Sequence, residues 1–328
     1  MHRRSLVCAG ALIGLGGATL AKDRDYRVGV LVLPAFMALP EARGKFRALL
    51  AQHGMIAGTN YTMVMGLPDE RGQFAPAAQQ LVGDGVDVIV AMGGSSSVLA
   101  AMQATSTIPI VMLSAGDPVG DHLVSSLAHP GGNVTGVCTF GVELVTKRLQ
   151  LLTQVLSEPT AIAYLSTHLF GKDFVQRYEA YERALTEAAG KASIRMEFVR
   201  IRDLADLEGA FDEIHRRRVD GVVLDNPPHF AGKEKVIASL ALAKHLPAIG
   251  DGPIFPAAGL LMSYGPDYLY AADRAADYVA RIWKGAKPGD LPVELVAKFD
   301  LSVNAATAEA LGVTLPPAVM VMASRVYR

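Results

Sequence analysis

The sequence predicts an α/β protein made of two doubly wound, Rossmann-like lobes with parallel sheets. Short apolar strands alternate with helical segments along almost the whole chain, and this alternation occurs twice, with a break near residues 129–140. The expected strand 26–33 is apolar on both faces, which is typical of parallel sheets covered by helices on both sides. The turn-rich segment HPGGN at 129–133 separates the two halves of the chain.

The first half has the order βαβαβαβ. The expected strands are 26–33, 61–65, 86–92 and 108–113, and the helices are 41–53, 73–82 and a segment from 93 to about 105. Gly54 follows the first helix, in the position where glycine commonly ends a helix. This order predicts one complete doubly wound lobe.

The second half repeats the alternation. The expected strands are 134–139, 161–166, 195–201, 221–224, 248–250 and 260–264, and the helices are 143–156, 173–189, 204–218 and 233–244. An amphipathic helix at 268–284, a strand at 294–300 and a helix at 305–311 follow. Local sequence does not assign these last elements to either lobe.

The N-terminus has the pattern of a secretory signal peptide, which we place at residues 1–21. Arg3 and Arg4 precede a Gly-interrupted apolar stretch, and small residues follow it. The stretch is too short for a spanning helix, so we expect export to the periplasm, by the general or the twin-arginine route. The formal net charge of −1 gives no basic field for nucleic acid. Cys138 would be the single cysteine of the mature chain, which excludes an intrachain disulfide.

Six polar or Gly-containing segments stand at the expected ends of apolar strands, where open α/β sheets bind ligands. They are PAF at 34–36, GGSS at 93–96, SAGD at 114–117, STH at 166–168, DN at 225–226 and GD at 250–251. Lobes that face each other would bring all six into one cleft for a small molecule. The candidate ligand-binding residues are Phe36, Gly94, Ser95, Ser96, Ser114, Asp117, Phe140, Thr167, Asn226 and Asp251.

Each candidate also has a structural interpretation. Gly94 and the serines after it begin a helix, where a ligand carboxylate would be attracted, although such serines also serve as N-caps. Asp117, Asp225 and Asp251 stand at strand ends, and one of them could bind an ammonium group, or each could only form a turn. Phe36 and Phe140 could enclose an apolar ligand or belong to the core.

Other chemistry has weaker support in the sequence. The histidines lack metal-ligand spacing, and neither a Walker loop nor a dinucleotide fingerprint is present, so we expect no metal and no cofactor. The segment 93–97 resembles a nucleophile elbow, but Ser97 stands where the last glycine belongs. A serine hydrolase, with His122 or His129 as the base, is therefore the alternative to a binding protein without enzymatic activity.

Several segments resemble the substrate-binding proteins of ABC transporters, specifically the tryptophan-binding-protein-like family. They are 86–91 with the following Gly-Ser turn, 107–111, 116–120, 127–136, 285–294, 298–301 and 310–317. The resemblance covers nearly the whole chain after residue 21. Relatives often have Gly-Thr-Pro where this chain has Gly94, Ser95 and Ser96, which leaves the identity of the ligand open.

The resemblance implies a type I periplasmic-binding-protein architecture with a three-strand hinge. The N-terminal lobe would be 26–138 plus 265–288, and the C-terminal lobe 139–264 plus 289–328. The helix at 268–284 would return to the first lobe, and the strand 294–300 would cross back to the second. Such a monomer would bind an amino acid, with aromatic and apolar ones as candidates, and deliver it to an ABC permease in the inner membrane. A periplasmic sensor module for a membrane receptor is the alternative with the same fold.

Overall fold

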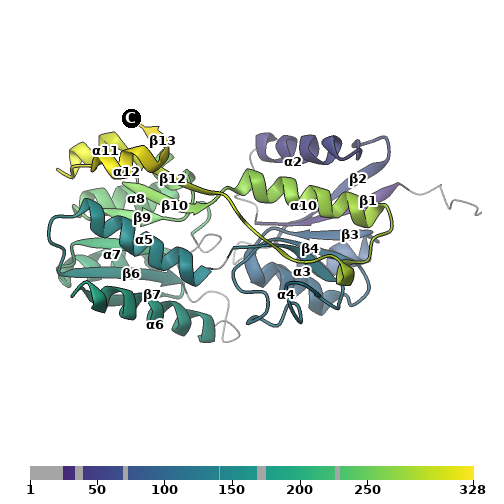
Figure 1. Cartoon of the computed structure of the whole chain (residues 1–328), viewed down its shortest axis with the longest axis horizontal. Coiled ribbons are helices and arrows are strands. Elements are labelled where there is room, and N and C mark those ends of the chain that lie inside the picture. The colour runs from purple at the N-terminus through teal and green to yellow at the C-terminus, as the bar shows by residue number, and fades with distance from the viewer. Residues whose placement is uncertain (1–24, 34–39, 69–72, 140, 168–174, 226–229) are drawn as a thin grey trace, which may run out of the picture.

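The computed structural model describes residues 25–33, 40–68, 73–139, 141–167, 175–225 and 230–328. The chain forms two lobes that lie side by side along its longest axis, and each lobe is built on one sheet (Figure 1). Apolar clusters cover both faces of each sheet, because its strands are apolar on both sides. The prediction of an α/β protein with two doubly wound lobes is confirmed.

The sheet of the first lobe has the strand order β11-β5-β4-β3-β1-β2, and all its pairings are parallel. Its strands are β1 (Tyr26–Leu31), β2 (Tyr61–Gly66), β3 (Val88–Ala91), β4 (Ile110–Ala115), β5 (Val134–Cys138) and β11 (Glu294–Leu295). One face is covered by α2 (Pro40–Gln52) and α10 (Tyr268–Trp283), and the other by α3 (Phe74–Gly83) and α4 (Gly94–Ala104). The carboxyl ends of these strands therefore lie at one edge of the sheet.

The sheet of the second lobe has the strand order β13-β12-β10-β9-β8-β6-β7. Its strands are β6 (Ala161–Thr167), β7 (Arg195–Ile201), β8 (Gly221–Leu224), β9 (Ala248–Gly250), β10 (Met262–Pro266), β12 (Phe299–Asn304) and β13 (Ala323–Tyr327). The helices on one face are α5 (Gly141–Val155), α6 (Val175–Lys191), α11 (Ala305–Ala310) and α12 (Pro317–Met322). Those on the other face are α7 (Leu207–Arg216), α8 (Glu234–Ala243) and α9 (Ile254–Ala257).

Three crossovers connect the lobes and lie beside one another. They join β5 to α5, β10 to α10 and β11 to β12. The amide of Asp267 in the second crossover donates to the carbonyl of Lys298 in the third, at 2.9 Å. The amide of Val296 donates to the carbonyl of Cys138, at the end of β5, also at 2.9 Å. Backbone bonds thus hold the three connections together as the three-strand hinge.

The third crossover differs from the sequence prediction. The expected single strand 294–300 is split, because β11 pairs with β5 in the first sheet whereas β12 pairs with β10 in the second. The segment 289–295, which we expected in the second lobe, therefore lies on the first. The β10–β12 pairing is antiparallel, in a sheet whose other described pairings are parallel. The physical reason is that β12 enters the second sheet from the hinge, whereas the preceding strands of that lobe run toward it.

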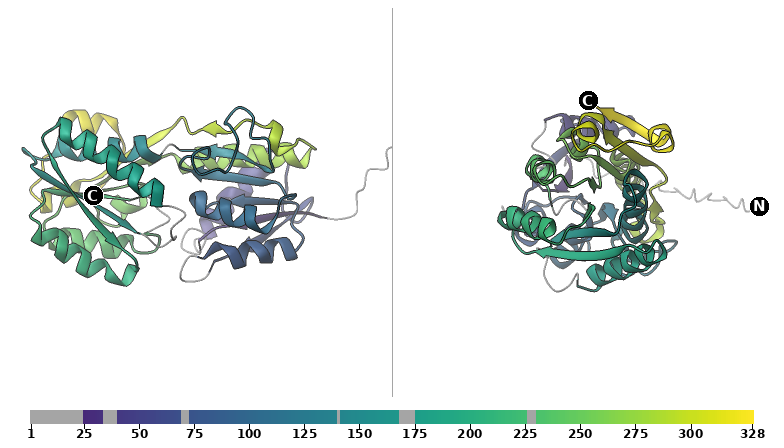
Figure 2. Two further views of the ribbon diagram at one scale, coloured as in Figure 1. Left: turned by 90° about the horizontal axis from the view of Figure 1, so that it is seen from below. Right: turned by 90° about the vertical axis from the view of Figure 1, so that its left-hand side faces the viewer.

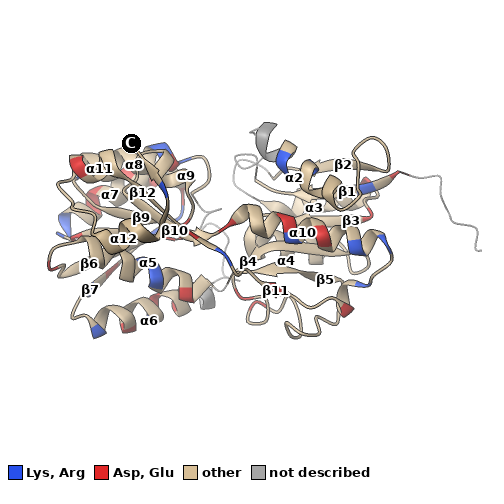
Figure 3. Ribbon diagram, turned by 45° about the horizontal axis from the view of Figure 1, so that its top comes forward, with Lys and Arg blue, Asp and Glu red and all other residues tan. Residues whose placement is uncertain are grey.

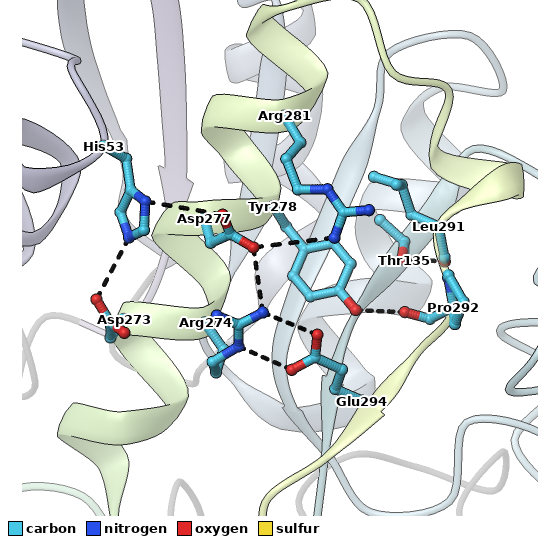
Figure 4. A network of polar contacts seen from close by, with 10 residues as sticks. All are labelled: His53, Thr135, Asp273, Arg274, Asp277, Tyr278, Arg281, Leu291, Pro292 and Glu294. Carbon is cyan, nitrogen blue, oxygen red and sulfur yellow. Dashed lines mark hydrogen bonds and ion pairs between the residues drawn. The ribbon is translucent and has the colours of Figure 1, made fainter.

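A network of polar contacts attaches the segment before the third crossover to the first lobe (Figure 4). Arg274 of α10 donates to both carboxylate oxygens of Glu294 in β11, from Nε at 2.8 Å and from a terminal nitrogen at 2.9 Å. Tyr278 donates to the carbonyl of Pro292. Thr135 of β5 donates to the carbonyl of Leu291 at 2.7 Å. These bonds explain why the segment stays on the first lobe until residue 295.

Acidic and basic residues are interspersed on the helices of both lobes (Figure 3), in agreement with the net charge of −1. Across the described ranges, no helix has the length and apolar character that a membrane span needs.

Candidate functional site

The turn between β3 and α4 is the first part of the candidate site. Gly94 has a φ of +64°, a left-handed conformation that glycine adopts without strain. A Cβ on Gly93 would overlap the ring of Phe74, so this position also requires glycine. The Ser97 hydroxyl accepts a bond from the amide of Gly93 at 2.9 Å and donates to the carbonyl of Gly94 at 2.8 Å. Ser97 therefore stabilises the turn, which presents the start of α4 at the carboxyl edge of the sheet.

The serines of this turn differ in what they contact. Ser95 is buried, and its hydroxyl donates to Asp121 at 2.6 Å, a partner that sequence reasoning did not identify. Ser96 is half-buried. In the described part of the chain, the bonds of Ser95 and Ser97 go to Asp121 and to the backbone, with no histidine among their partners. The arrangement that a serine hydrolase needs is therefore not formed by these described side chains.

The end of β4 contributes Ser114 and Asp117. Ser114 is half-buried, and Asp117 is exposed. The Asp117 carboxylate accepts a hydrogen bond from the amide of Gly120 at 2.9 Å. This bond corresponds to the second interpretation of Asp117, in which the residue stabilises a turn instead of binding a ligand. In this conformation, Asp117 closes its own loop.

A buried polar cluster forms the second part of the candidate site, at the carboxyl edge of the second sheet. Asp225 follows β8 and Asp251 follows β9, and both are buried, with exposed fractions of 1% and 2%. Tyr164 of β6 donates to Asp225 at 2.8 Å, and Tyr268 of α10 donates to Asp251 at 2.5 Å. The guanidinium of Arg148 forms an ion pair with Asp251. The cluster thus joins two strand ends, one second-lobe helix and one first-lobe helix.

Sequence reasoning identified neither the two tyrosines of this cluster nor Arg148. Arg148 lies on α5 with no exposed surface, and it donates to the carbonyls of Tyr264 at 2.8 Å and Leu224 at 3.5 Å. A signal was present in the sequence, because Arg148 lies on the same helical stripe as Val145, Leu149 and Leu152, all buried. A charged residue within an apolar stripe indicates a buried partner.

Burial determines the proton affinities within the cluster. Loss of water raises the pKa of Asp251, and the neighbouring Asp225 raises it further, while Arg148 and the bond from Tyr268 act in the opposite direction. Burial raises the pKa values of Tyr164 and Tyr268 well above their usual range, and the nearby carboxylates raise them further by a smaller amount. Both phenols therefore remain donors near neutral pH.

The end of β6 adds two hydroxyls to this edge. Ser166 and Thr167 are buried, with exposed fractions of 1% and 0%, and their hydroxyl oxygens have no hydrogen-bond partner among the residues that the structure describes. Burying an unpaired hydroxyl is unfavourable, so such groups are uncommon in folded proteins. Thr167, a predicted site residue, thus places at the carboxyl edge of the second sheet a buried hydroxyl that has no partner among the described residues.

Contacts between the lobes show that these two edges face each other, an arrangement that the views in Figure 2 also display. The hydroxyl of Tyr181 in α6 lies 3.3 Å from the point that a Cβ on Gly116 would occupy, just after β4. Ala231, in the loop after β8, packs against the apolar cluster of the first lobe. Helix α6 and the loop after β8 therefore contact the first lobe across the lobe boundary.

The remaining predicted residues, Phe36, Phe140 and Asn226, lie outside the described residues. Among the residues that are described, no group of three or more His, Cys, Asp or Glu side chains is arranged to hold a metal ion.

Comparison with known proteins is consistent with this geometry. A curated tyrosine-binding protein of Clostridioides difficile (strain R20291) is 24% identical over 300 residues, which are 88% of this chain and 81% of the relative. A solved conserved domain protein from Vibrio cholerae has a TM-score of 0.81 and 28% identity, over 92% of this chain and 100% of that chain. The ABC domain of a Streptococcus pneumonia protein in complex with L-Trp has the same TM-score and coverage at 21% identity.

The sequence profile of one family matches nearly the entire chain, from residue 27 to residue 327, and its description is ABC transporter substrate binding protein. The architecture agrees, since the solved relatives share the two-lobed fold over 92% of this chain. The chain belongs to the family of ABC transporter substrate-binding proteins.

Proposed function

We propose that this protein is the periplasmic receptor of an ABC importer, which binds an amino acid between its lobes and delivers it to a membrane permease. Its N-terminal segment serves as the export signal, and the protein acts as a monomer without transforming its ligand. The observation that carries the proposal is the pair of buried carboxylates, Asp225 and Asp251, at a sheet edge that faces the other lobe.

The charges of the cluster favour an ammonium group. Asp225 and Asp251 place two buried carboxyl groups at this edge, and Arg148 forms an ion pair with Asp251. A ligand ammonium would form charge-assisted hydrogen bonds with the carboxyl oxygens of this cluster. The buried hydroxyls of Ser166 and Thr167, which have no partner in the described part of the chain, offer further polar contacts at the same edge.

The opposite lobe suits a carboxylate. The turn at Gly93 and Gly94 places the first amides of α4 at the facing edge, and the N-terminus of a helix attracts negative charge. An amino acid carries an ammonium and a carboxylate on one carbon, so it can engage both lobes at once. Closure by hinge bending would enclose it.

Two relatives suggest an aromatic side chain, because one is named for tyrosine and the other was solved with L-Trp. We therefore propose an aromatic amino acid as the ligand.

We expect L-tryptophan or L-tyrosine to raise the melting temperature, measured by thermal shift. A ligand present at 100 times its Kd stabilises the folded state by about 2.7 kcal/mol. In calorimetric titrations, removing the ammonium, as in indole-3-propionate, should weaken binding about tenfold or more. Asp225→Asn should weaken the binding of L-tryptophan or L-tyrosine by a similar factor, because it replaces a buried carboxyl group of the cluster by an amide.

Asp212→Asn is the matched control, since it removes a carboxylate from the exposed ion pair with Lys244 in the same lobe. We expect this variant to bind as the wild type does. The proposal is wrong if amino acids do not raise the melting temperature, or if indole-3-propionate binds as tightly as tryptophan.

A further inference from the structure

Tyr268 lies where the second crossover enters the first lobe. It is the first residue of α10, and only Asp267 separates it from β10 in the second sheet. Its ring packs against the apolar core of the first lobe. Its hydroxyl, in contrast, donates to the Asp251 carboxylate of the second lobe at 2.5 Å. One side chain thus contacts both bodies that the hinge separates.

The acceptor of this bond is held rigidly in the second lobe. Asp251 is buried and forms an ion pair with Arg148, which also binds the carbonyl of Tyr264 in β10. A Cβ on Gly265 would overlap the carbonyl oxygen of Asp251, so the residues before the crossover pack directly against it. Rotation about the hinge would therefore move the phenol of Tyr268 relative to a stationary carboxylate.

We propose that Tyr268 is a positioning residue of the hinge, whose bond to Asp251 favours the interlobe angle at which the cleft retains its ligand. A hydrogen bond from a phenol to a carboxyl oxygen weakens steeply when its distance and angle depart from the preferred geometry. It therefore lowers the free energy of this interlobe angle relative to others. The effect on ligand retention rests on the proposed function, whereas the effect on the hinge angle does not.

Tyr278 provides the matched control on the same helix. It is also a tyrosine that donates a hydrogen bond, but it is buried, and its acceptor is the carbonyl of Pro292, within the first lobe (Figure 4). Replacing either tyrosine by Phe removes one hydroxyl from α10. A purely structural role would give the two variants the same consequences.

The experiment measures the interlobe distance without ligand and then the rate of ligand release. Spin labels at Gln79→Cys on α3 and Glu208→Cys on α7, both exposed, report the distance distribution. Cys8 is replaced by Ser, and Cys138 stays unlabelled because it is buried, which raises its thiol pKa to about 11. Release of L-tryptophan or L-tyrosine is followed by stopped flow.

Tyr268→Phe should broaden or shift the distance distribution of the ligand-free protein and raise the dissociation rate constant about tenfold. Tyr278→Phe should lower the melting temperature but leave the distances and the release rate unchanged. The inference would be overturned if Tyr268→Phe kept the interlobe distance distribution of the wild type. It would also be overturned if Tyr268→Phe and Tyr278→Phe changed the distances and the release rate equally. If neither amino acid binds the wild type, the proposed function fails, and the distance measurement still decides the role of Tyr268.

Discussion

Replacing Arg148 by Met is expected to lower the free energy of unfolding by about 3–5 kcal/mol, as is typical when one partner of a buried ion pair is removed. Arg148 has no exposed surface and pairs with Asp251, which is 2% exposed. Methionine approximates the volume of the side chain but leaves Asp251 beside Asp225 without a compensating charge. Urea unfolding at pH 7, followed by circular dichroism, measures the loss.

The pH dependence of this loss identifies its cause. Burial already raises the pKa of Asp251 and Arg148 lowers it, so the variant should raise it further. Asp225, Tyr164 and Tyr268 are the other titratable groups of the cluster. A carboxyl group with a raised folded-state pKa contributes stability below its unfolded pKa of about 3.9 and loses that contribution as pH rises through the folded value.

The deficit of Arg148→Met should therefore be smaller at pH 4 than at pH 8. Adding Asp251→Asn should recover part of it at pH 8, because the uncompensated charge is removed. An equal deficit at both pH values, with no recovery in the double variant, would show that packing and not charge causes the loss.

Replacing Gly136 by Ala should destabilise the first lobe by about 3 kcal/mol or more, since strain and overpacking each contribute of the order of 1–3 kcal/mol. Gly136 lies in β5 with a φ of +127°, in a region that L residues rarely adopt. A Cβ there would overlap the backbone of Met112 in β4, which cannot move without disturbing the sheet. Because β5 leads into the first crossover, ligand binding should weaken as well.

Gly132→Ala is the control for this substitution. It lies four residues earlier, and a Cβ at this position meets no atom within 4 Å. We expect its melting temperature to stay close to that of the wild type. Similar melting temperatures for the two variants would contradict the assignment of strain to Gly136.

Much of the fold could be predicted because each strand carries its own signal. The segments 161–166, 221–224 and 248–250 are short, apolar and bounded by polar residues or proline, and they correspond to β6, β8 and β9. The crossing strand could not be divided by the same reasoning. Whether Leu295 or Phe299 joins the first or the second sheet depends on pairings with Cys138 and Pro266, far away in the sequence.

The candidate site was predictable only where it follows from topology. Asp251 stands at a strand end and was found for that reason. Its partner Arg148 was not, because the two residues are 103 positions apart and a helical arginine is ordinarily exposed. Ser95 was weighed as a ligand contact or an N-cap, and its bond to Asp121 depends on a loop 26 residues away. Tertiary contacts thus determine what the strand ends can do.

A crystal structure with L-tryptophan or L-tyrosine, whichever binds more tightly, tests the central claim most directly. We predict that the amino acid lies between the turn at Gly94 and the edge at Asp225. Its ammonium should lie within about 3.2 Å of a carboxylate oxygen of Asp225 or Asp251. An amino acid bound on an outer surface, or between the lobes with its ammonium in solvent, would contradict the account.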